Sequence, residues 1–463
     1  MNRNAPPSAN AAAQLIAFAS ALDLQSVPHA VVDRARWCLL DALGCGLFGS
    51  GQEWSRIMFD EMRSEQSQGP CTVYGRRETL PAAPAAMCNG TAIHGFELDD
   101  VLASALVHPG TVIIPAVLAA GEAVDASGPQ ILRGIIAGYE SIARLSLALG
   151  TGPSERGFHK TSVVGPVAAA IAAGVVTGLS VEQLTWAVGL ACSTGSGIKS
   201  FAAGTGGGMV KRMHAGRAAE SGVRVSQLAR RGFTGPSSAV DGHLGLLEVF
   251  SGESAQPGQL HQGLGAQWAL SGVWIKVYPT CGWIQGPAQL LLGMRGAQPL
   301  APQRVRKIVV GTSKFAVKHN GNHAPTDTME AQYSLPYCAA LAAIGNPSDP
   351  AAYTLEALKN PIVRDLTARV ELEVDADSEA VYPGRVGCRV QLHLDSGEIR
   401  EGATLDPHGS PADPCTDDEL IAKFRRLAAL APTPCNVSAI VEGVRSLETI
   451  ASIRAFTAHM HTM

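Results

Sequence analysis

The stretch TSVVGPVAAAIAAGVVTGLSV, which runs from Thr161 to Val181, contains no charged residue and few large side chains. It is rich in Ala and Gly and holds one proline, Pro166. A membrane-spanning helix normally carries more Leu, Ile and Phe than this. A helix that is apolar on all sides is also what the interior of a large helical protein requires. The stretch therefore predicts a helix buried in the middle of a mainly helical domain.

Helical patterns extend outward from this stretch over the first 270 residues. Gly and Pro separate them, and an early pattern follows Pro28 as far as Leu47 and stops near Gly49. The other expected helices cover residues 83–98, 111–124, 128–149, 163–178, 181–192 and 212–231. We therefore expect residues 1–270 to form one all-helical domain.

The pattern changes near residue 271. The segment 307–312 (KIVVGT) is a short β-branched run, and the segments 369–374 (RVELEV) and 389–394 (RVQLHL) alternate apolar with polar residues. Such segments are typical of strands. The residues Asp395-Ser396-Gly397 then provide the turn of a hairpin, because Asp and Gly adopt turn conformations readily.

These patterns predict a mainly α protein with a smaller α+β domain at residues 271–405. Helical patterns resume at 416–429 and 436–446. Residues 406–463 are therefore expected to return to the helical domain, which would be built from both ends of the chain.

Charge and cysteine content exclude several classes of protein. The 463 residues carry a net charge of −4 without a run of five like charges, so a surface for nucleic acid or an acidic membrane is not expected. The ten cysteines form no CxxC pair, which argues against a zinc ribbon or a redox dithiol. The start, MNRNAPPSANAAA, lacks the apolar segment of a secretory signal. Unpaired thiols without such a signal predict the cytoplasm.

The densest cluster of polar residues is NGTAIHGFELDD, residues 89–100, with HPG following at 108–110. It contains three acids within four residues and two flanking histidines: Glu97, Asp99, Asp100, His94 and His108. In a partly buried site the acids repel one another, which raises at least one carboxyl pKa, and imidazole is the usual proton carrier near neutral pH. The alternative is a helix end with solvated acids. No metal is expected, because HExxH and repeated acidic spacing are absent.

Three further clusters are candidates for chemistry. In RGFHKTS, residues 156–162, His159 precedes the uncharged helix, whose first N–H groups attract anions; the alternative is a polar cap. The segment 204–217 (GTGGGMVKRMHAGR) begins with a glycine-rich loop, which is followed by Lys211, Arg212 and His214. Its guanidinium groups suit carboxylates, although a solvated basic face is the alternative. In KVYPTCGW, residues 276–283, Cys281 is either a reactive thiol or inert packing.

These segments, in this order, resemble the MmgE/PrpD family of 2-methylcitrate dehydratases, cis-aconitate decarboxylases and iminodisuccinate epimerases. The resemblance runs from about residue 10 to 450. Its carriers are NGTAIHGFELDD…HPG (89–110), GYE (138–140), RGFHKTS (156–162), MVKRMHAGRAAESG (209–222), RRGFTGP (230–236), AQYSLPY (331–337) and DPCTDDELIAKF (413–424). It implies a large helical domain from both chain ends, an inserted α+β domain, an active site between them, and a homodimer.

Matched by motif, the decarboxylase-type site of the family implies roles for Glu97, His108, His159 and Lys211. Many members have Asp where this chain has Glu97. The remaining family histidine is replaced by Cys281, and a second common histidine of that segment is replaced by Gln285.

The clusters and the resemblance together predict a cofactor-free lyase, either a dehydratase or a decarboxylase. It would act on a small di- or tricarboxylate by removing the proton α to a carboxylate, with Lys211 or His159 as the base. The predicted catalytic residues are Lys211, His159, His108, Glu97 and Tyr139, and the predicted substrate-binding residues are Asp99, Asp100, Arg212, His214, Cys281 and Gln285. The alternatives are an epimerase of a dicarboxylate such as iminodisuccinate, with Tyr139 returning the proton, and a non-catalytic carboxylate binder.

Overall fold

The computed structural model describes residues 11–65, 68–202, 208–382 and 384–461. The chain divides into two compact units. The helical unit comprises Met1–Gly95, Ala105–Val273 and Asp417–Met463, and the sheet unit comprises Phe96–Ser104 and Trp274–Thr416.

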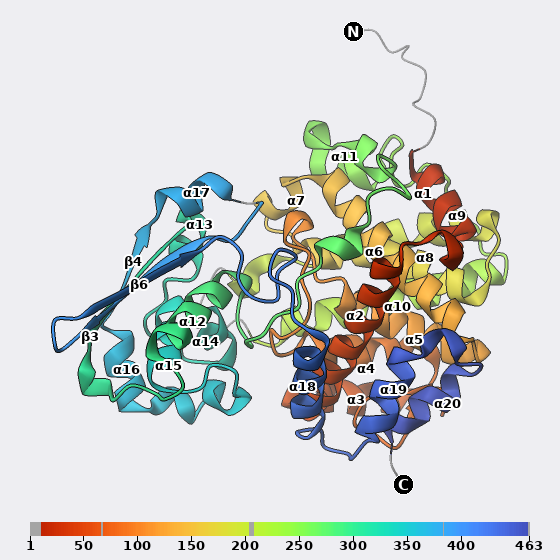
Figure 1. Cartoon of the computed structure of the whole chain (residues 1–463). Helices are drawn as coiled ribbons and strands as arrows, with labels where there is room; N and C mark the ends of the chain where they lie inside the picture. Colours follow the sequence, from red (N-terminus) through yellow and green to blue (C-terminus); the bar gives the residue numbers. More distant parts are fainter. Residues whose placement is uncertain (1–10, 66–67, 203–207, 383, 462–463) are drawn as a thin grey trace, which may run out of the picture. The chain divides into compact units, whose positions relative to one another are not determined.

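The helical unit contains segments from both ends of the chain (Figure 1). Its helices are α1 (Ala11–Ala21), α2 (His29–Gly49), α3 (Glu53–Glu65), α4 (Ala82–His94), α5 (Gly110–Val124), α6 (Gly128–Leu149), α7 (Gly152–Glu155), α8 (Lys160–Thr177), α9 (Val181–Cys192), α10 (Val210–Arg230), α11 (Leu246–Ser251), α18 (Asp417–Ala428), α19 (Val437–Arg445) and α20 (Ile453–Thr457). A short antiparallel pair, β1 (Cys71–Thr72) and β2 (Thr79–Leu80), precedes α4. The fold class predicted from the sequence is confirmed.

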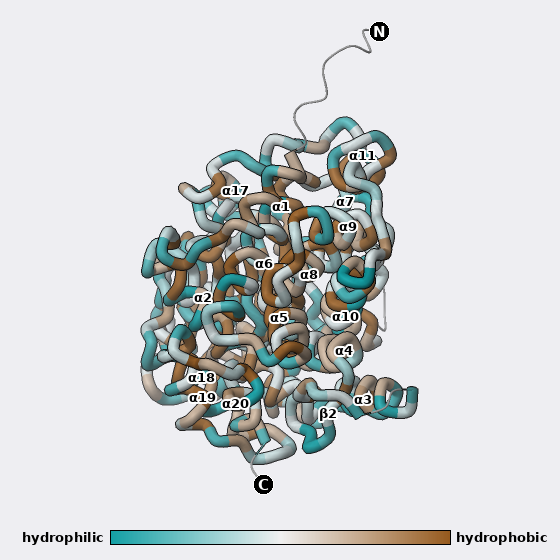
Figure 2. Tube along the Cα trace, turned by 90° about the vertical axis from the view of Figure 1, so that its right-hand side faces the viewer, coloured by the Kyte–Doolittle hydropathy of each residue, from teal (hydrophilic) through white to brown (hydrophobic). Residues whose placement is uncertain are grey.

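The uncharged helix α8 is buried among its neighbours, as predicted. It packs against α5, α6, α9 and α10, and the tube in Figure 2 is brown along much of α5 and α6. It is long and apolar enough to cross a membrane by composition, but 94% of that stretch is buried inside the protein. Small residues permit this packing: a Cβ added at Gly222 of α10 would lie 2.3 Å from the Cβ of Ala169.

The C-terminal helices return to the N-terminal ones through an ion pair and apolar packing. The Lys423 Nζ of α18 lies 2.6 Å from an Asp41 carboxylate oxygen of α2, and both side chains are buried. Amphipathic α18 buries Leu420, Phe424 and Leu427. The two ends of the chain are thus held in one core.

The sheet unit contains four strands in the order β4-β3-β5-β6. Strand β3 (Val305–Thr312) is parallel to β4 (Val370–Val374) and antiparallel to β5 (Cys388–Leu394), which forms a hairpin with β6 (Ile399–Thr404). The helices of this unit are α12 (Gly282–Arg295), α13 (Lys314–His319), α14 (Thr328–Tyr333), α15 (Leu335–Ile344), α16 (Pro361–Thr367) and α17 (Ala376–Val381). Helix α12 contacts β5 and β6, and α15 contacts β4.

The units differ from the predicted domain ranges at three places. Residues Phe96–Ser104, predicted in the helical domain, belong to the sheet unit, because the Val101 N–H donates to the Trp274 carbonyl at 2.9 Å and the Trp274 N–H donates back at 2.8 Å. Residues 271–273 belong to the helical unit and 406–416 to the sheet unit. The helix expected over 83–98 ends at His94, because Glu97 has φ +58°, which no right-handed helix accommodates.

Candidate active site

Four histidine rings form a continuous chain inside the helical unit. His94 is the last residue of α4, His108 lies just before α5, His159 is the N-cap of α8, and His214 lies in α10. The His94 ring lies edge-on to His108 at 5.0 Å between centroids and is stacked on His159 at 5.7 Å with 12° between planes. The His159 and His214 rings are 5.3 Å apart. Packing thus brings together residues from four separate segments.

The closest contact in this chain joins His159 to His214, whose Nδ1 atoms are 3.1 Å apart. The side chain of His159 makes no capping bond to its helix, so its predicted alternative as a polar cap is not what the structure shows. Phe201 lies near-perpendicular to His159 at 5.7 Å and at a steep angle to His214 at 5.8 Å. Both histidines are buried.

Burial keeps these imidazoles neutral. It lowers the pKa of His159 well below its usual value, and the nearby His94, His214, His108 and Lys199 lower it further. Burial also lowers the pKa of His214, with a smaller contribution from the Lys211 ammonium. A neutral imidazole can accept a proton or donate one, which suits either direction of proton transfer.

Backbone contacts determine where His159 lies. Its N–H donates to the Gly197 carbonyl at 2.9 Å, and the Lys199 N–H donates to Gly157 at 2.7 Å. Gly197 has φ +110°, and a Cβ there would lie 2.6 Å from Ser162 Oγ and 3.3 Å from His214 Cε1. A larger residue here would therefore displace Ser162 and press on His214, and the positive φ also favours glycine.

Three lysines of the helical unit are associated with these histidines. Two of them lower a histidine pKa, and the third is next to His159 in the sequence. Lys211 is fully buried in the first turn of α10 and lowers the pKa of His214, whereas Lys199 acts on His159. Lys160 follows His159 directly, and its Nζ donates to the Gly150 carbonyl at 2.8 Å. Burial lowers the pKa of Lys160 to about 8. The glycines Gly204, Gly206 and Gly207 of the predicted loop lie outside the described residues.

Arg212 makes contacts that differ from its predicted role in binding a substrate carboxylate. Its Nε donates to the Gly95 carbonyl at 3.0 Å, its guanidinium also donates to Gly208 at 2.7 Å, and it lies 4.1 Å from the centre of the Trp54 ring. Such contacts stabilise the end of α4, whose C-cap is Gly95. The predicted role of Arg212 in binding a substrate carboxylate stays a prediction.

Tyr139 is fully buried in α6, which packs against α8. Its role in returning a proton stays a prediction.

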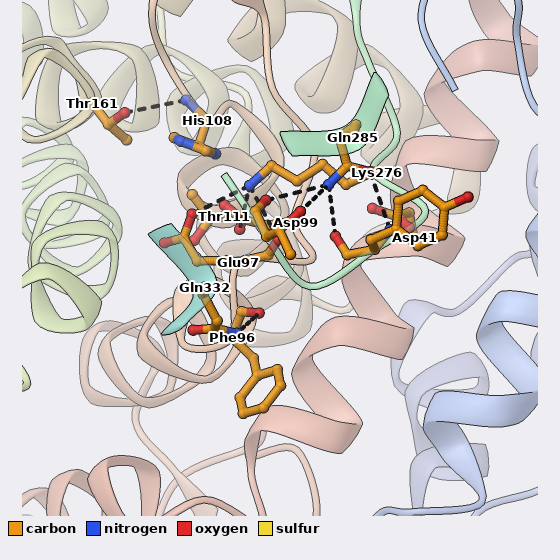
Figure 3. Close-up of polar contacts among 12 residues, drawn as sticks. Asp41, Phe96, Glu97, Asp99, His108, Thr111, Thr161, Lys276, Gln285 and Gln332 are labelled. Carbon is orange, nitrogen blue, oxygen red and sulfur yellow. Dashed lines mark hydrogen bonds and ion pairs between the residues drawn. The ribbon is translucent and has the colours of Figure 1, made fainter. Parts of the chain in front are cut away.

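The acids Glu97 and Asp99 lie in the sheet unit, where they share a buried lysine (Figure 3). The Lys276 Nζ donates to the Glu97 carbonyl at 3.2 Å and lies 3.4 Å from its Oε2 and 4.0 Å from Asp99 Oδ1. The three side chains are 1 to 4% exposed. The neighbouring Asp100 is also buried. The predicted repulsion among the acids is thus offset by a cation that sequence reasoning did not select.

The backbone at Glu97 is strained as well. Its φ of +58° lies in the left-handed region, which Asp and Asn tolerate better than Glu. Such strain persists where surrounding contacts impose it and is frequent at functional sites. The Gln332 Nε2 provides one such contact by donating to the neighbouring Phe96 carbonyl at 2.8 Å.

Gln285 holds the loop between Lys276 and Cys281. Its Oε1 accepts from the Val277 and Tyr278 N–H groups at 3.1 Å, and its Nε2 donates to the Tyr278 carbonyl at 2.9 Å and to Thr280 Oγ1 at 2.8 Å. Its amide is occupied by this loop, so these contacts favour a positioning role over the predicted substrate contact.

Cys281 is the buried N-cap of α12, and its N–H donates to the Gln332 carbonyl at 2.9 Å. Sequence reasoning missed Gln332, Lys276 and Phe201, and it noted His94 without selecting it. Gln332 lies in the AQYSLPY motif, and a buried lysine is what three neighbouring acids require.

Metal independence stays a prediction, as does the absence of any other cofactor.

Comparisons with known proteins cover nearly the whole chain. A model of the MmgE/PrpD N-terminal domain matches residues 13–258, and a model of the MmgE/PrpD C-terminal domain matches residues 278–449.

Named relatives with similar sequences include enzymes of two kinds. Cis-aconitate decarboxylase of Aspergillus terreus (strain NIH 2624 / FGSC A1156) is 28% identical over 95% of this chain and 94% of its own. The cis-aconitate decarboxylase of Homo sapiens is 27% identical over 95% and 93%. The 2-methylcitrate dehydratase of Escherichia coli O157:H7 is 29% identical over 48% of each chain. Decarboxylases and dehydratases are lyases, which confirms the predicted enzyme class.

Proposed function

This chain belongs to the MmgE/PrpD family, and on that premise we propose that it is a lyase acting on a small tricarboxylate of the cis-aconitate or 2-methylcitrate type. The observation that carries the proposal is the chain of buried histidines around His159 in the helical unit. We favour decarboxylation, because the relatives that match along nearly the whole chain are named decarboxylases, whereas the named dehydratases match about half.

The chemistry of either reaction needs a group that holds one proton reversibly. Loss of CO2 leaves an electron pair on a carbon, which must then take up a proton. Dehydration removes the proton next to a carboxylate and protonates the departing hydroxyl. His159 suits both tasks, since its neutral form accepts a proton and its protonated form is strongly acidic when buried. His108, at the other end of the ring chain, is the candidate for the second proton.

Cationic side chains explain how the site would hold a polyanion. Lys199 and Lys211 both act on the histidines electrostatically, so a bound carboxylate would experience the same positive field. That field also stabilises the negative charge that develops on the substrate. Arg212 is left out of this set because its guanidinium holds Gly95 and Trp54.

The binder alternative has less support. His159 and His214 are buried and in contact, which a passive carboxylate binder would not require.

Proton NMR in deuterated water tests the proposal directly. Cis-aconitate, 2-methylcitrate, citrate and iminodisuccinate would each be incubated with enzyme and with a His159→Gln control. We expect loss of CO2 with deuterium in the product, or loss of water, from a tricarboxylate, and turnover roughly 10²-fold or more slower by the control. Deuterium exchange or epimerisation of a dicarboxylate, without loss of CO2 or water from any tricarboxylate, would replace the proposal by the epimerase. Absence of any reaction or exchange would contradict it.

We further propose that the enzyme is a cytoplasmic homodimer, as the family resemblance implies. Support for a reducing compartment comes from its ten cysteines, all of which are free thiols. Light scattering coupled to gel filtration would measure the mass in solution, and a monomer would contradict the dimer.

A further inference from the structure

We infer that His214 is a positioning residue that sets the tautomer of His159, and that His94 holds the plane of the His159 ring. The inference deepens the proposed function and rests on it for its role in turnover. It departs from the expectation that His214 binds substrate. The contact that carries it is the 3.1 Å separation between the Nδ1 atoms of His159 and His214.

At that distance only one of the two Nδ1 atoms can carry a proton at any one time. Two imidazole nitrogens at hydrogen-bond distance consist of one N–H donor and one lone-pair acceptor. When the Nδ1 of His159 donates, its Nε2 has a lone pair and can act as a base. When that Nδ1 accepts, the proton of neutral His159 lies on Nε2, which can then act as an acid. When Nε2 takes a proton from the substrate and the Nδ1 proton passes to His214, His159 is therefore converted from base to acid.

The proton count balances in both directions. In proton removal, a substrate C–H bond breaks, its electron pair stays on the substrate, and an N–H bond forms at His159 Nε2. The Nδ1 proton of His159 passes to His214, which then carries the positive charge. In the reverse direction, the pair first takes up one proton from water, so that His159 holds a proton on Nε2 and His214 carries the positive charge. The Nε2 proton then goes to the carbon that lost CO2, and His214 returns its proton to His159 Nδ1.

The surroundings make the charged state of this pair short-lived. The groups that act on His159 are His94 from α4, His108 from the loop before α5, His214 from α10 and Lys199 from η3 (Lys199–Ala202), and each disfavours its protonated form. Lys211 does the same to His214. A proton taken up by the pair is therefore readily returned.

His94 provides the geometric part of the inference. Its ring is fully buried, stacked on His159 at 12° and edge-on to His108. Phe201 contacts both His159 and His214. With a ring stacked on it and a ring packed against it edge-on, the His159 imidazole is held with Nδ1 facing His214.

The tautomer of His159 can be measured without substrate. Nitrogen-15 NMR of histidine-labelled enzyme distinguishes protonated from unprotonated Nδ1, and the His159→Gln variant assigns the signals. We expect His214→Phe, which keeps an aromatic ring but removes the partner nitrogen, to change the Nδ1 and Nε2 shifts of His159. The control is His243→Phe, an exposed histidine of the same unit. Unchanged His159 shifts in the folded His214→Phe variant would overturn the inference.

Turnover separates this inference from the proposed function. We expect His214→Phe to lower kcat by roughly 10-fold to 100-fold with a smaller effect on KM, and to move the acidic limb of the pH profile. His214→Asn, which can hydrogen-bond at the Nδ1 position but cannot carry the proton, should recover less than wild-type activity and only one His159 tautomer. An enzyme with no activity on any acid but with the expected NMR change would refute the proposed function and support the inference.

The role of His94 has its own comparison. His94→Phe preserves a stacked ring, whereas His94→Ala removes it, so kcat should fall further in the alanine variant. Equal losses in both variants, with folding confirmed by circular dichroism, would mean that a His94 nitrogen is required and would overturn the plane-holding role.

Discussion

The histidine chain of the helical unit and the acid–lysine cluster of the sheet unit bury titratable groups in opposite ways. His159 and His214 are neighbours of other histidines and of lysines, so burial and charge both oppose their protonation. Glu97 and Asp99 instead share the Lys276 ammonium, which offsets part of their negative charge. Clusters of acids and histidines in the sequence therefore do not by themselves reveal which residues exchange protons. Groups whose surroundings disfavour their charged form are the ones poised to exchange a proton.

The largest expected effect is on turnover, when the proton-carrying His159 is replaced. His159→Gln should lower kcat by roughly 10²-fold to 10⁴-fold, the range for a general acid or base. Its free energy of unfolding should change much less, because the amide is smaller than the ring but still polar. Steady-state kinetics and urea denaturation on the same preparation measure both. A variant with near-normal kcat would remove His159 from the mechanism.

Substitution in the acid–lysine cluster should instead lower the free energy of unfolding. Lys276→Met leaves Glu97 and Asp99 buried without their cation, which should lower the free energy of unfolding by about 3–5 kcal/mol. The double variant Lys276→Met/Glu97→Gln should recover part of that loss, since one uncompensated charge is gone. The matched control is Lys359→Met, whose side chain is 72% exposed. A single variant as stable as the control would contradict the buried pairing.

Lys211 is a buried residue that lowers the pKa of His214, and two substitutions distinguish a role as the base from a role in binding a carboxylate. If Lys211 is the base predicted from the sequence, Lys211→Ala and Lys211→Arg should both lower kcat by roughly 10²-fold or more, since arginine cannot accept the proton. If it binds a carboxylate, Lys211→Arg should keep much of kcat and mainly raise KM. The histidine chain leads us to expect the second outcome. Loss of substrate hydrogen exchange in the arginine variant, with its fold intact, would support the first.

The stability of the enzyme should fall below pH 6.5. His159 and His214 have lower pKa values in the folded than in the unfolded chain, so the unfolded state binds more protons as the pH drops through that range. Each group then contributes a loss of up to about 1.4 kcal/mol per pH unit. Urea denaturation between pH 7.5 and 5.0 measures the slope. The slope should flatten in His214→Phe, and an identical slope there would exclude His214 as a contributor.

The smallest expected effect concerns metals. If the histidines carry protons rather than a metal ion, exhaustive chelation should leave kcat unchanged within error. The measurement compares chelated enzyme with enzyme supplemented by Mg²⁺, Mn²⁺, Fe²⁺ or Zn²⁺. Activity that is lost on chelation and restored by one of these ions would make the histidines ligands instead.

Local sequence patterns determined much of the fold. The absence of charge over Thr161–Val181 predicted the buried helix α8, and alternation at 389–394 with the Asp395–Gly397 turn predicted the β5–β6 hairpin. These predictions held because helix and strand periodicity, turn chemistry and burial are properties of neighbouring residues. The motifs likewise identified the family, since their order along the chain is itself a sequence property.

The partners of the functional side chains were decided by the tertiary structure alone. Lys276 and Glu97 are 179 positions apart, and His159 and His214 are 55 apart, so no local pattern relates them. The packing of α8 against α10, permitted by small residues such as Gly222, brings the two histidines together. The pairing of Val101 with Trp274 likewise carries the acids into the sheet unit. A sequence specifies which side chains are available, but the electrostatic state of each depends on which others the fold places within a few ångströms of it.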